Sequence, residues 1–211
     1  MTAADPTPGS VIQLPEPNRS GSETLETTLD SRRSRREFEP GPLTLSTVSQ
    51  LLWAGQGTNH PEGFRTAPSA GATYPLVVRL VVAENGVREL AAGVYRYRPA
   101  GHELVYESTE PVQAELSAAA YDQEWVKSAP VDIVIAGIEE RTAREYGSRA
   151  GDLYVPMEAG HAGQNVHLQA EALGLATVPV GGFRDEAVAD VLDLTDARPL
   201  IMYPVGQRKE A

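Results

Sequence analysis

Residues 157–183 constrain the fold of this chain more than any other stretch. Small apolar residues recur through its first part at steps of three and four, the period of a helix with one buried face: Ala159, Ala162, Val166, Ala170 and Leu173. Gly174 follows where a helix ends in the left-handed conformation, which glycine adopts without a Cβ clash. Because the stripe is slim, another backbone can approach it closely. We expect a tightly packed helix that begins near Gly151 or Asp152, with Asp152 as its cap.

A glycine pair lies a few residues beyond this helix, in the sequence Pro179-Val180-Gly181-Gly182-Phe183. Proline and glycine weaken a strand and mark a turn or loop. Two interpretations stay open at this point. The segment is an ordinary turn after a core helix, or it is a loop laid against a flat ligand.

Four arginines fall within five positions, in the sequence Arg32-Arg33-Ser34-Arg35-Arg36. Like charges at helical spacing repel each other, so the cluster is costly without an anion nearby. It is a solvated basic patch, a nucleic-acid patch or a phosphate site, for which arginine supplies forked donors and serine a hydroxyl. The whole chain carries a net charge of −11, whereas nucleic-acid surfaces are basic. The composition therefore favours the phosphate site.

A third segment, residues 65–75, consists mainly of small residues with prolines at Pro68 and Pro75. Such a segment lets exposed backbone and the Ser69 hydroxyl approach a planar ligand. Taken alone it is a turn, because glycine and proline mark turns more often than ligands.

The remaining periodicities predict a chain of the α+β class. Apolar or alternating runs predict strands over residues 76–82, 93–99, 102–106, 130–138 and 199–208. Helical spacing and capping residues predict helices over residues 24–36, 42–54, 111–121, 139–146 and 184–192. The turn at residues 99–102 joins the second and third strands as an antiparallel hairpin.

Length and composition predict one domain over residues 22–211, preceded by a flexible N-terminal arm over residues 1–21. The arm has no basic start and no apolar run, so it is not a secretory signal. No run reaches the roughly 18 consecutive apolar residues of a membrane span, and we expect a cytoplasmic protein. The chain has no cysteine, which excludes disulfides, thiolate metal sites and a cysteine nucleophile.

Several catalytic and cofactor motifs are missing from the sequence. There is no Gly-x-Gly-x-x-Gly after a strand, no Walker-type glycine-lysine motif and no Gly-x-Ser-x-Gly elbow. His161 and His167 are six positions apart, the wrong spacing for one helix face. We therefore expect no metal site.

The segments described above, taken together, resemble the flavin-dependent nitroreductase superfamily, in particular its branch of SagB-type and McbC-like oxidoreductases of thiazole and oxazole biosynthesis. The matching segments are residues 32–38, 68–75, 158–161 with 164–165, 174–175, 179–183 and 204–206. They follow the order of the family and span about residues 25 to 208.

The resemblance implies a nitroreductase-like fold, with a central, mixed but largely antiparallel sheet flanked by helices. It also implies a domain-sharing homodimer that binds two FMN molecules at its interface. By resemblance, Arg32, Ser34 and Arg36 would hold the flavin's phosphate, ribityl chain and pyrimidine edge. Arg208 would add a second cation at the phosphate.

The two remaining segments would complete this implied FMN site. Pro68, Ser69, Ala70 and Gly71 would come from the other subunit. Pro179 and Val180 would cover one face of the ring, and the backbone N–H of Gly181, next to Gly182, would point at the flavin N5.

The implied activity is an FMN-dependent oxidoreductase that passes a hydride from NAD(P)H to a nitroaromatic or quinone acceptor. The azoline dehydrogenases of the branch use a Lys-Tyr pair, but here Tyr146 is preceded by Glu145. An azoline dehydrogenase of modified peptides and a non-catalytic flavin-binding protein stay open as alternatives. Tyr146 and His161 are the nearest candidates for proton transfer, and no catalytic side chain is assigned.

Overall fold

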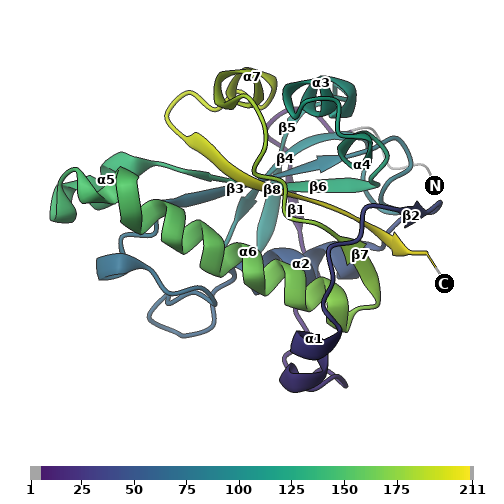
Figure 1. Cartoon of the computed structure of the whole chain (residues 1–211), viewed down its shortest axis with the longest axis horizontal. Coiled ribbons are helices and arrows are strands. Elements are labelled where there is room, and N and C mark those ends of the chain that lie inside the picture. Colours follow the sequence, from purple (N-terminus) through teal and green to yellow (C-terminus); the bar gives the residue numbers. More distant parts are fainter. Residues whose placement is uncertain (1–5, 210–211) are drawn as a thin grey trace.

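A computed structural model describes residues 6–209 of the chain; residues 1–5 and 210–211 lie outside the described part. An eight-stranded sheet forms its centre, in the order β1-β5-β4-β3-β6-β8-β2, with β7 also paired to β8 (Figure 1). The strands are β1 Val11–Gln13, β2 Phe38–Glu39, β3 Leu76–Val82, β4 Gly93–Arg98, β5 Glu103–Ser108, β6 Val131–Gly137, β7 Leu175–Thr177 and β8 Arg198–Arg208. Every pairing of these strands is antiparallel. The expected α+β fold with a largely antiparallel sheet is confirmed.

Helices cover both faces of the sheet. They are α1 Leu25–Ser31, α2 Leu45–Gln56, α3 Gln113–Ala119, α4 Glu124–Lys127, α5 Glu139–Tyr146, α6 Val155–Ala172 and α7 Asp185–Val191. The pair α2 and α6 lies on one side of the sheet, and α3 and α7 lie on the other (Figure 1). Thr44 caps α2, because its side chain accepts a hydrogen bond from the Thr47 N–H.

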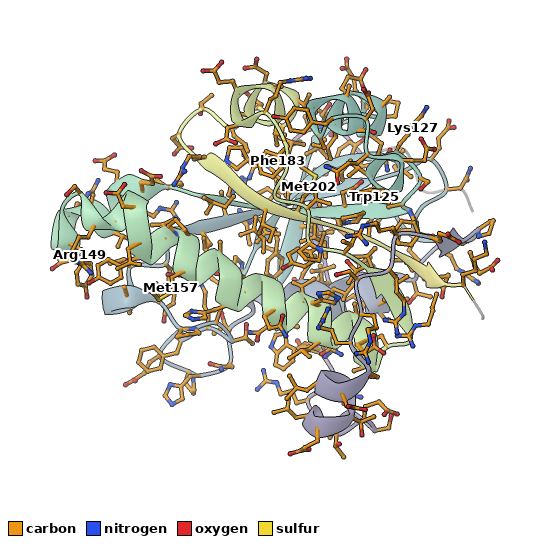
Figure 2. The ribbon with its side chains drawn as sticks, viewed as in Figure 1. Trp125, Lys127, Arg149, Met157, Phe183 and Met202 are labelled. Atoms are coloured by element: carbon orange, nitrogen blue, oxygen red, sulfur yellow. The ribbon has the colours of Figure 1, made fainter. Side chains whose placement is uncertain are left out.

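The alternation of side chains along the strands divides the interior into two apolar layers. On β3, Leu76, Val78, Leu80 and Val82 face the layer that contains the buried side of α6. Val81, on the opposite face of the same strand, packs in the layer beneath α3 and α7. Phe183 and Met202 belong to this second layer, and both lie between the sheet and those helices (Figure 2).

Helix α6 is the long element that the sequence predicts, but it begins differently. A π-helical turn, Ala150–Tyr154, runs directly into it, and no side chain caps its start. The expected cap at Asp152 is therefore wrong, because the backbone is already helical at that residue. The expected stop is confirmed, since Gly174 has a φ of +68°. Gly163 faces Tyr203 of β8 so closely that a side chain would overlap the ring.

The N-terminal arm differs from the expected flexible segment. Val11–Gln13 forms β1, which pairs with β5. Leu14 is buried in the first apolar layer. Next to it, the Ser49 hydroxyl donates a 2.5 Å hydrogen bond to the Pro15 carbonyl. The expectation of flexibility is wrong for this part of the arm, because long-range pairing fixes a segment without local periodicity.

The first helix is shorter than expected. It ends at Ser31, and residues 32–37 form an extended link to β2. The Arg35 N–H donates to the Thr177 carbonyl at 2.9 Å, which ties this link to β7. The arginine cluster thus lies on extended backbone rather than on a helix, where its like charges would repel one another at helical spacing.

Candidate functional site

The hydrogen bonds of residues 32–36 divide the arginines into two groups. The guanidinium of Arg33 donates to the carbonyls of Asp30 and Arg32, and that of Arg35 pairs with Glu171. Among residues 6–209, the side chains of Arg32, Ser34 and Arg36 have no hydrogen-bond partner. The three residues that the resemblance assigns to the cofactor are thus the ones left available.

Glu171 is the counter-charge of this region. Its carboxylate lies 2.5 Å from Arg35 Nη1 and 2.9 Å from Arg208 Nη2, and only 4% of its side chain is exposed. Hydrogen bonding to Arg35 and Ser31, with the charge of Arg208, outweighs burial and lowers the pKa of Glu171. Arg208, expected as a second phosphate cation, therefore already has a carboxylate partner.

Helix α4 joins the arginine segment to the glycine pair. The Arg36 guanidinium lies over the Trp125 ring, 5.3 Å from its centroid. The Gln123 side chain donates to the Gly182 carbonyl at 2.8 Å. Arg36 and the loop of residues 179–182 are thereby held beside the same short helix.

The loop itself divides its residues between the interior and the surface. Val180 pairs with Met202 through two backbone hydrogen bonds of 2.8 and 3.0 Å. Its side chain is buried in the core, so of the two residues expected to cover a ring only Pro179 offers an exposed side chain. The N–H of Gly181 has no acceptor among residues 6–209, and the space beside this glycine is open.

The segment with Pro68, Ser69, Ala70 and Gly71 forms a tight turn elsewhere. A 3₁₀ turn spans Ala70–Ala72, and Gly71 and Ala72 both have positive φ. The Ser69 hydroxyl accepts the Tyr74 N–H at 2.9 Å and closes the turn. Pro68 and Gly71 are exposed, while Ser69 and Ala70 are half-buried.

A buried carboxylate lies beneath this turn. Glu158 of α6 is 3% exposed, and its Oε1 has no hydrogen-bond partner among the described residues. Burial raises the pKa of Glu158 to about 7, against the opposing effects of the Ser69 hydroxyl and the Arg65 charge. Arg65 lies 4.5 Å from the centroid of the Tyr74 ring. The Ser69 hydroxyl and the Arg65 charge thus both act on the Glu158 carboxyl.

The two groups of expected residues lie at opposite ends of α6. Glu158 lies at the end beside the turn of residues 68–71, here called the serine turn. Glu171 lies at the end beside the arginines. At about 1.5 Å of rise per residue, roughly 20 Å of helix separates them. Within one chain, the residues that the resemblance assigns to one cofactor therefore do not meet.

Comparison with known proteins identifies the family of this chain. The model of the nitroreductase family matches residues 29–207. A protein of Methanocaldococcus jannaschii, provisionally named a nitroreductase, is 44% identical over 200 residues, which are 94% of this chain and 97% of the relative. The chain belongs to the nitroreductase family. It is accordingly a flavin-dependent oxidoreductase.

Two further similarities place the chain within the nitroreductases. A crystal structure from Ralstonia eutropha JMP134, also provisionally named a nitroreductase, has a TM-score of 0.83 at 28% identity, covering all of this chain and 97% of the other. The microcin B17-processing protein McbC of Escherichia coli is 30% identical over 170 residues. The match covers 78% of this chain and 62% of McbC. The expected resemblance to the McbC-like branch is confirmed.

The two candidates for proton transfer in this nitroreductase differ in their surroundings. Tyr146, at the end of α5, is 37% exposed and packs against Tyr154 with ring centroids 4.8 Å apart. Its hydroxyl covers Gly71, where an added Cβ would lie 2.9 Å from the oxygen. His161 is exposed on the outer side of α6. Only Tyr146 contacts one of the expected cofactor segments.

Sequence reasoning missed Glu158, Glu171 and Trp125 as members of these groups. The alternation of charge and apolar residues on α6 shows only that the two glutamates lie on a helix. Their partners come from segments far away in sequence, so no local pattern could have identified them. His167, considered in the sequence only for its spacing from His161, is buried and donates to the Arg33 carbonyl at 3.1 Å.

Proposed function

We propose that this nitroreductase binds one FMN per chain in a homodimer and passes a hydride from NAD(P)H to a nitroaromatic or quinone acceptor. The observation that carries the proposal is the sorting of the arginine segment. Arg32, Ser34 and Arg36 have no side-chain hydrogen-bond partner among residues 6–209, whereas Arg33 and Arg35 bond within the protein. Forked cations with a neighbouring hydroxyl suit a phosphate.

The other residues beside α4 fit a flat ring. Pro179 offers an exposed apolar side chain, and the Gly181 N–H is a backbone donor with open space beside it. Sites for flat ligands combine apolar contact with a few such donors. A bound flavin supplies the redox chemistry, while these residues bind and orient it.

The separation of the two groups along α6 favours a homodimer. Two copies related by a two-fold axis, with their α6 helices antiparallel, would bring the serine turn of each to the arginines of the other. Large apolar side chains are exposed around this helix, among them Leu25, Leu29, Met157 and Leu173, each at least 40% exposed. Such a patch is typical of an interface between protein chains.

The first test compares two arginines of the same segment. We expect the purified protein to carry about one FMN per chain, and Arg36→Glu to lose it, because a carboxylate then repels the phosphate. Arg33→Glu is the matched control and should keep FMN, since the Arg33 guanidinium already bonds to the Asp30 and Arg32 carbonyls. The measurement is flavin absorbance and titration of apoprotein with FMN. Equal loss in both variants, or no flavin binding by the wild type, contradicts the proposed site.

The second test asks whether two chains share each site. Arg36→Glu and Pro68→Trp damage different ends of α6, and Pro68 is an exposed residue whose replacement leaves the core intact. In a mixed dimer of the two variants, one site carries both changes and the other carries neither. The two variants are unfolded, mixed in equal amounts and refolded together. About half of the dimers are then mixed, so up to about a quarter of the FMN binding should return. No recovery means that each site lies within one chain.

The third test concerns the reaction itself. Rapid mixing of the FMN-loaded protein with NADH or NADPH should bleach the flavin absorbance, and menadione should restore it. A protein that binds FMN but is reduced by neither nucleotide contradicts NAD(P)H as the donor and leaves the cofactor site standing.

A second candidate function is oxidation of an azoline in a modified peptide. The similarity to McbC and the contact of Tyr146 with Gly71 favour it. If hydride transfer is the whole chemistry, Tyr146→Phe and His161→Ala should lower quinone reduction by less than the ~100-fold that is typical of losing a general acid or base. A larger loss for Tyr146→Phe at unchanged FMN content favours the azoline dehydrogenase.

A further inference from the structure

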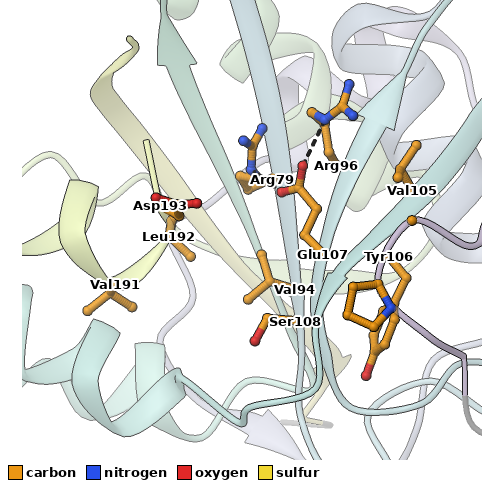
Figure 3. A pocket seen from close by; sticks show the side chains of 12 residues that line it. Arg79, Val94, Arg96, Val105, Tyr106, Glu107, Ser108, Val191, Leu192 and Asp193 are labelled. Carbon is orange, nitrogen blue, oxygen red and sulfur yellow. Dashed lines mark hydrogen bonds and ion pairs between the residues drawn. The ribbon is translucent and has the colours of Figure 1, made fainter. Parts of the chain in front are cut away.

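A cavity of about 540 Å³ opens over β3, β4 and β5, beside the C-terminal end of α7 (Figure 3). Its sheet-side lining includes Arg79, Arg96 and Glu107, and α7 with the residues after it contributes Val191, Leu192 and Asp193. None of these belongs to the two groups at the ends of α6. The cavity has the volume of a small-molecule site, and the proposed reaction makes no use of it.

The centre of the cavity wall is one carboxylate shared by two arginines. Glu107 Oε2 lies 2.7 Å from Arg79 Nε, and Glu107 Oε1 accepts a hydrogen bond from Arg96 Nε at 2.8 Å (Figure 3). Each of these contacts uses the Nε of its arginine. A guanidinium has four more N–H donors on its two terminal nitrogens. Both oxygens of Glu107 are therefore paired, while the terminal nitrogens of Arg79 and Arg96 remain available as donors.

Arg79 is the more deeply placed of the two cations. Its side chain is 11% exposed; its Nε is ion-paired with Glu107 without a hydrogen bond, and its buried Nη1 has no hydrogen-bond partner among residues 6–209. Burial lowers the pKa of the Arg79 guanidinium, although the negative charge of Glu107 acts in the opposite direction. The lowered pKa reflects how poorly water solvates the cation there. A buried donor without an acceptor is costly, so an acceptor that enters the cavity is favoured.

The charges of the lining limit the kind of anion. Arg79 and Arg96 are balanced by Glu107 and by Asp193 at the rim, so the cavity as a whole is close to neutral. A polyphosphate would meet repulsion from both carboxylates, whereas a single negative charge could be held by the terminal nitrogens of the two arginines. Planar guanidinium groups match a carboxylate in particular.

The rest of the wall is apolar. Val94 and Val105 come from the sheet, Val191 is the last residue of α7, and Leu192 directly follows it (Figure 3). Val94, Val105 and Leu192 are already buried, but Val191 is only half-buried, so a ligand with a hydrophobic group gains by covering it. The charged and apolar parts of the cavity lie beside each other, so one small molecule can contact both.

We propose that this cavity binds a monocarboxylate with an apolar body, whose carboxylate accepts hydrogen bonds from the terminal nitrogens of Arg79 and Arg96. The apolar body packs between the valines of β4 and β5 and the end of α7. This site is separate from the proposed FMN site and does not depend on it.

The test uses benzoate as the probe and the methyl groups of the protein as reporters. The protein is labelled at Val and Leu methyls, keeps any cofactor with which it is purified, and is titrated with benzoate and with uncharged benzamide. We expect benzoate to shift the methyl resonances of Val94, Val105 and Leu192, and benzamide to bind at least tenfold more weakly. Shifts confined to Val180, in the loop of the proposed FMN site, would show that benzoate occupies that site and would overturn the proposal.

Substitutions then assign the charge that matters. Arg79→Met and Arg96→Met should each weaken benzoate binding about tenfold or more, as expected for losing a charged hydrogen bond. Glu107→Gln should tighten it, because the competing carboxylate becomes neutral. Arg98→Met is the matched control: Arg98 forms a 2.6 Å ion pair with Glu103 on the same two strands, outside the cavity lining.

Three results would contradict the site. They are no methyl shift at millimolar benzoate, equal weakening by Arg98→Met and both cavity variants, and equal binding of benzoate and benzamide. Circular dichroism and thermal unfolding of each variant control for folding. If Arg79→Met does not fold, the more exposed Arg96 carries the comparison, since its side chain is 39% exposed.

Discussion

Burial, more than any charged partner, sets the pKa of the Glu158 carboxyl. Its folded pKa is about 7, compared with an ordinary value of 4.5. Between these two values the folded chain binds more protons than the unfolded chain, so the free energy of unfolding falls as the pH rises. The stabilisation from the protonated carboxyl is complete below pH 4.5 and is lost above about pH 7.

We expect Glu158→Gln to remove this pH dependence, because the amide keeps the shape and cannot ionise. Relative to the wild type, the variant should gain stability as the pH rises, by up to about 3 kcal/mol at pH 8. Urea unfolding from pH 4.5 to 8 measures the difference. A constant difference across this range would mean that Glu158 is ionised in the folded protein throughout.

Glu171 represents the opposite case, a buried carboxylate held by two arginines. We expect Glu171→Gln to destabilise the fold by about 2–4 kcal/mol, because removing one member of a buried ion pair leaves charges without compensation. The arginines are 27% and 31% exposed, which keeps the loss below that of a fully buried pair. Urea unfolding at pH 7 measures it.

The control for Glu171 is Glu140→Gln in α5. Glu140 pairs with Arg144 at 3.1 Å, but both side chains are more than 70% exposed. Surface pairs contribute about 0–1 kcal/mol, so this variant should unfold almost as the wild type does. Equal losses at both positions would mean that the charge of Glu171 is solvated.

At the scale of one element, two glycines of α6 have different roles. A methyl group at Gly163 would overlap the ring of Tyr203 on β8, whereas a methyl group at Gly160 would meet open space. We expect Gly163→Ala to cost about 1–3 kcal/mol through overpacking. Gly160→Ala should instead gain about 0.5–1 kcal/mol through helix propensity. Thermal unfolding of the two variants compares them, and equal effects would mean that α6 does not lie tightly on the sheet at Gly163.

At the scale of the whole molecule, the outer side of α6 and the neighbouring α1 form the surface proposed for dimerisation. Leu29 is 51% exposed and Met157 is 46% exposed, on either side of this surface. We expect Leu29→Glu combined with Met157→Glu to convert a dimer into a folded monomer that has lost FMN, because charge replaces apolar contact. Light scattering, circular dichroism and flavin content measure the three properties.

The matched control for the dimer is Val11→Glu. Val11 is 52% exposed but lies in β1, at the far edge of the sheet. This variant should remain dimeric and keep its flavin. A wild-type monomer that binds FMN tightly would contradict the shared site.

Most element positions could be predicted from the sequence because they depend on neighbours a few residues away. The strand at residues 76–82 and the helix at residues 139–146 appear with the predicted bounds, and Gly174 ends α6 as its lack of a Cβ allows. The arm around Val11 and the end of α1 at Ser31 were predicted incorrectly, because distant strands decide both.

By itself, the sequence determined the α+β class and the family, and it predicted the segments of the candidate site. Only the tertiary structure decided which arginines are available, since Arg35 and Glu171 meet across 136 positions. It likewise decided that Glu158 is buried beside Arg65, and that the serine turn and the arginines lie at opposite ends of α6. The physical reason is that spacing and capping are local properties of a chain, whereas burial and ion pairing depend on which distant segments pack together.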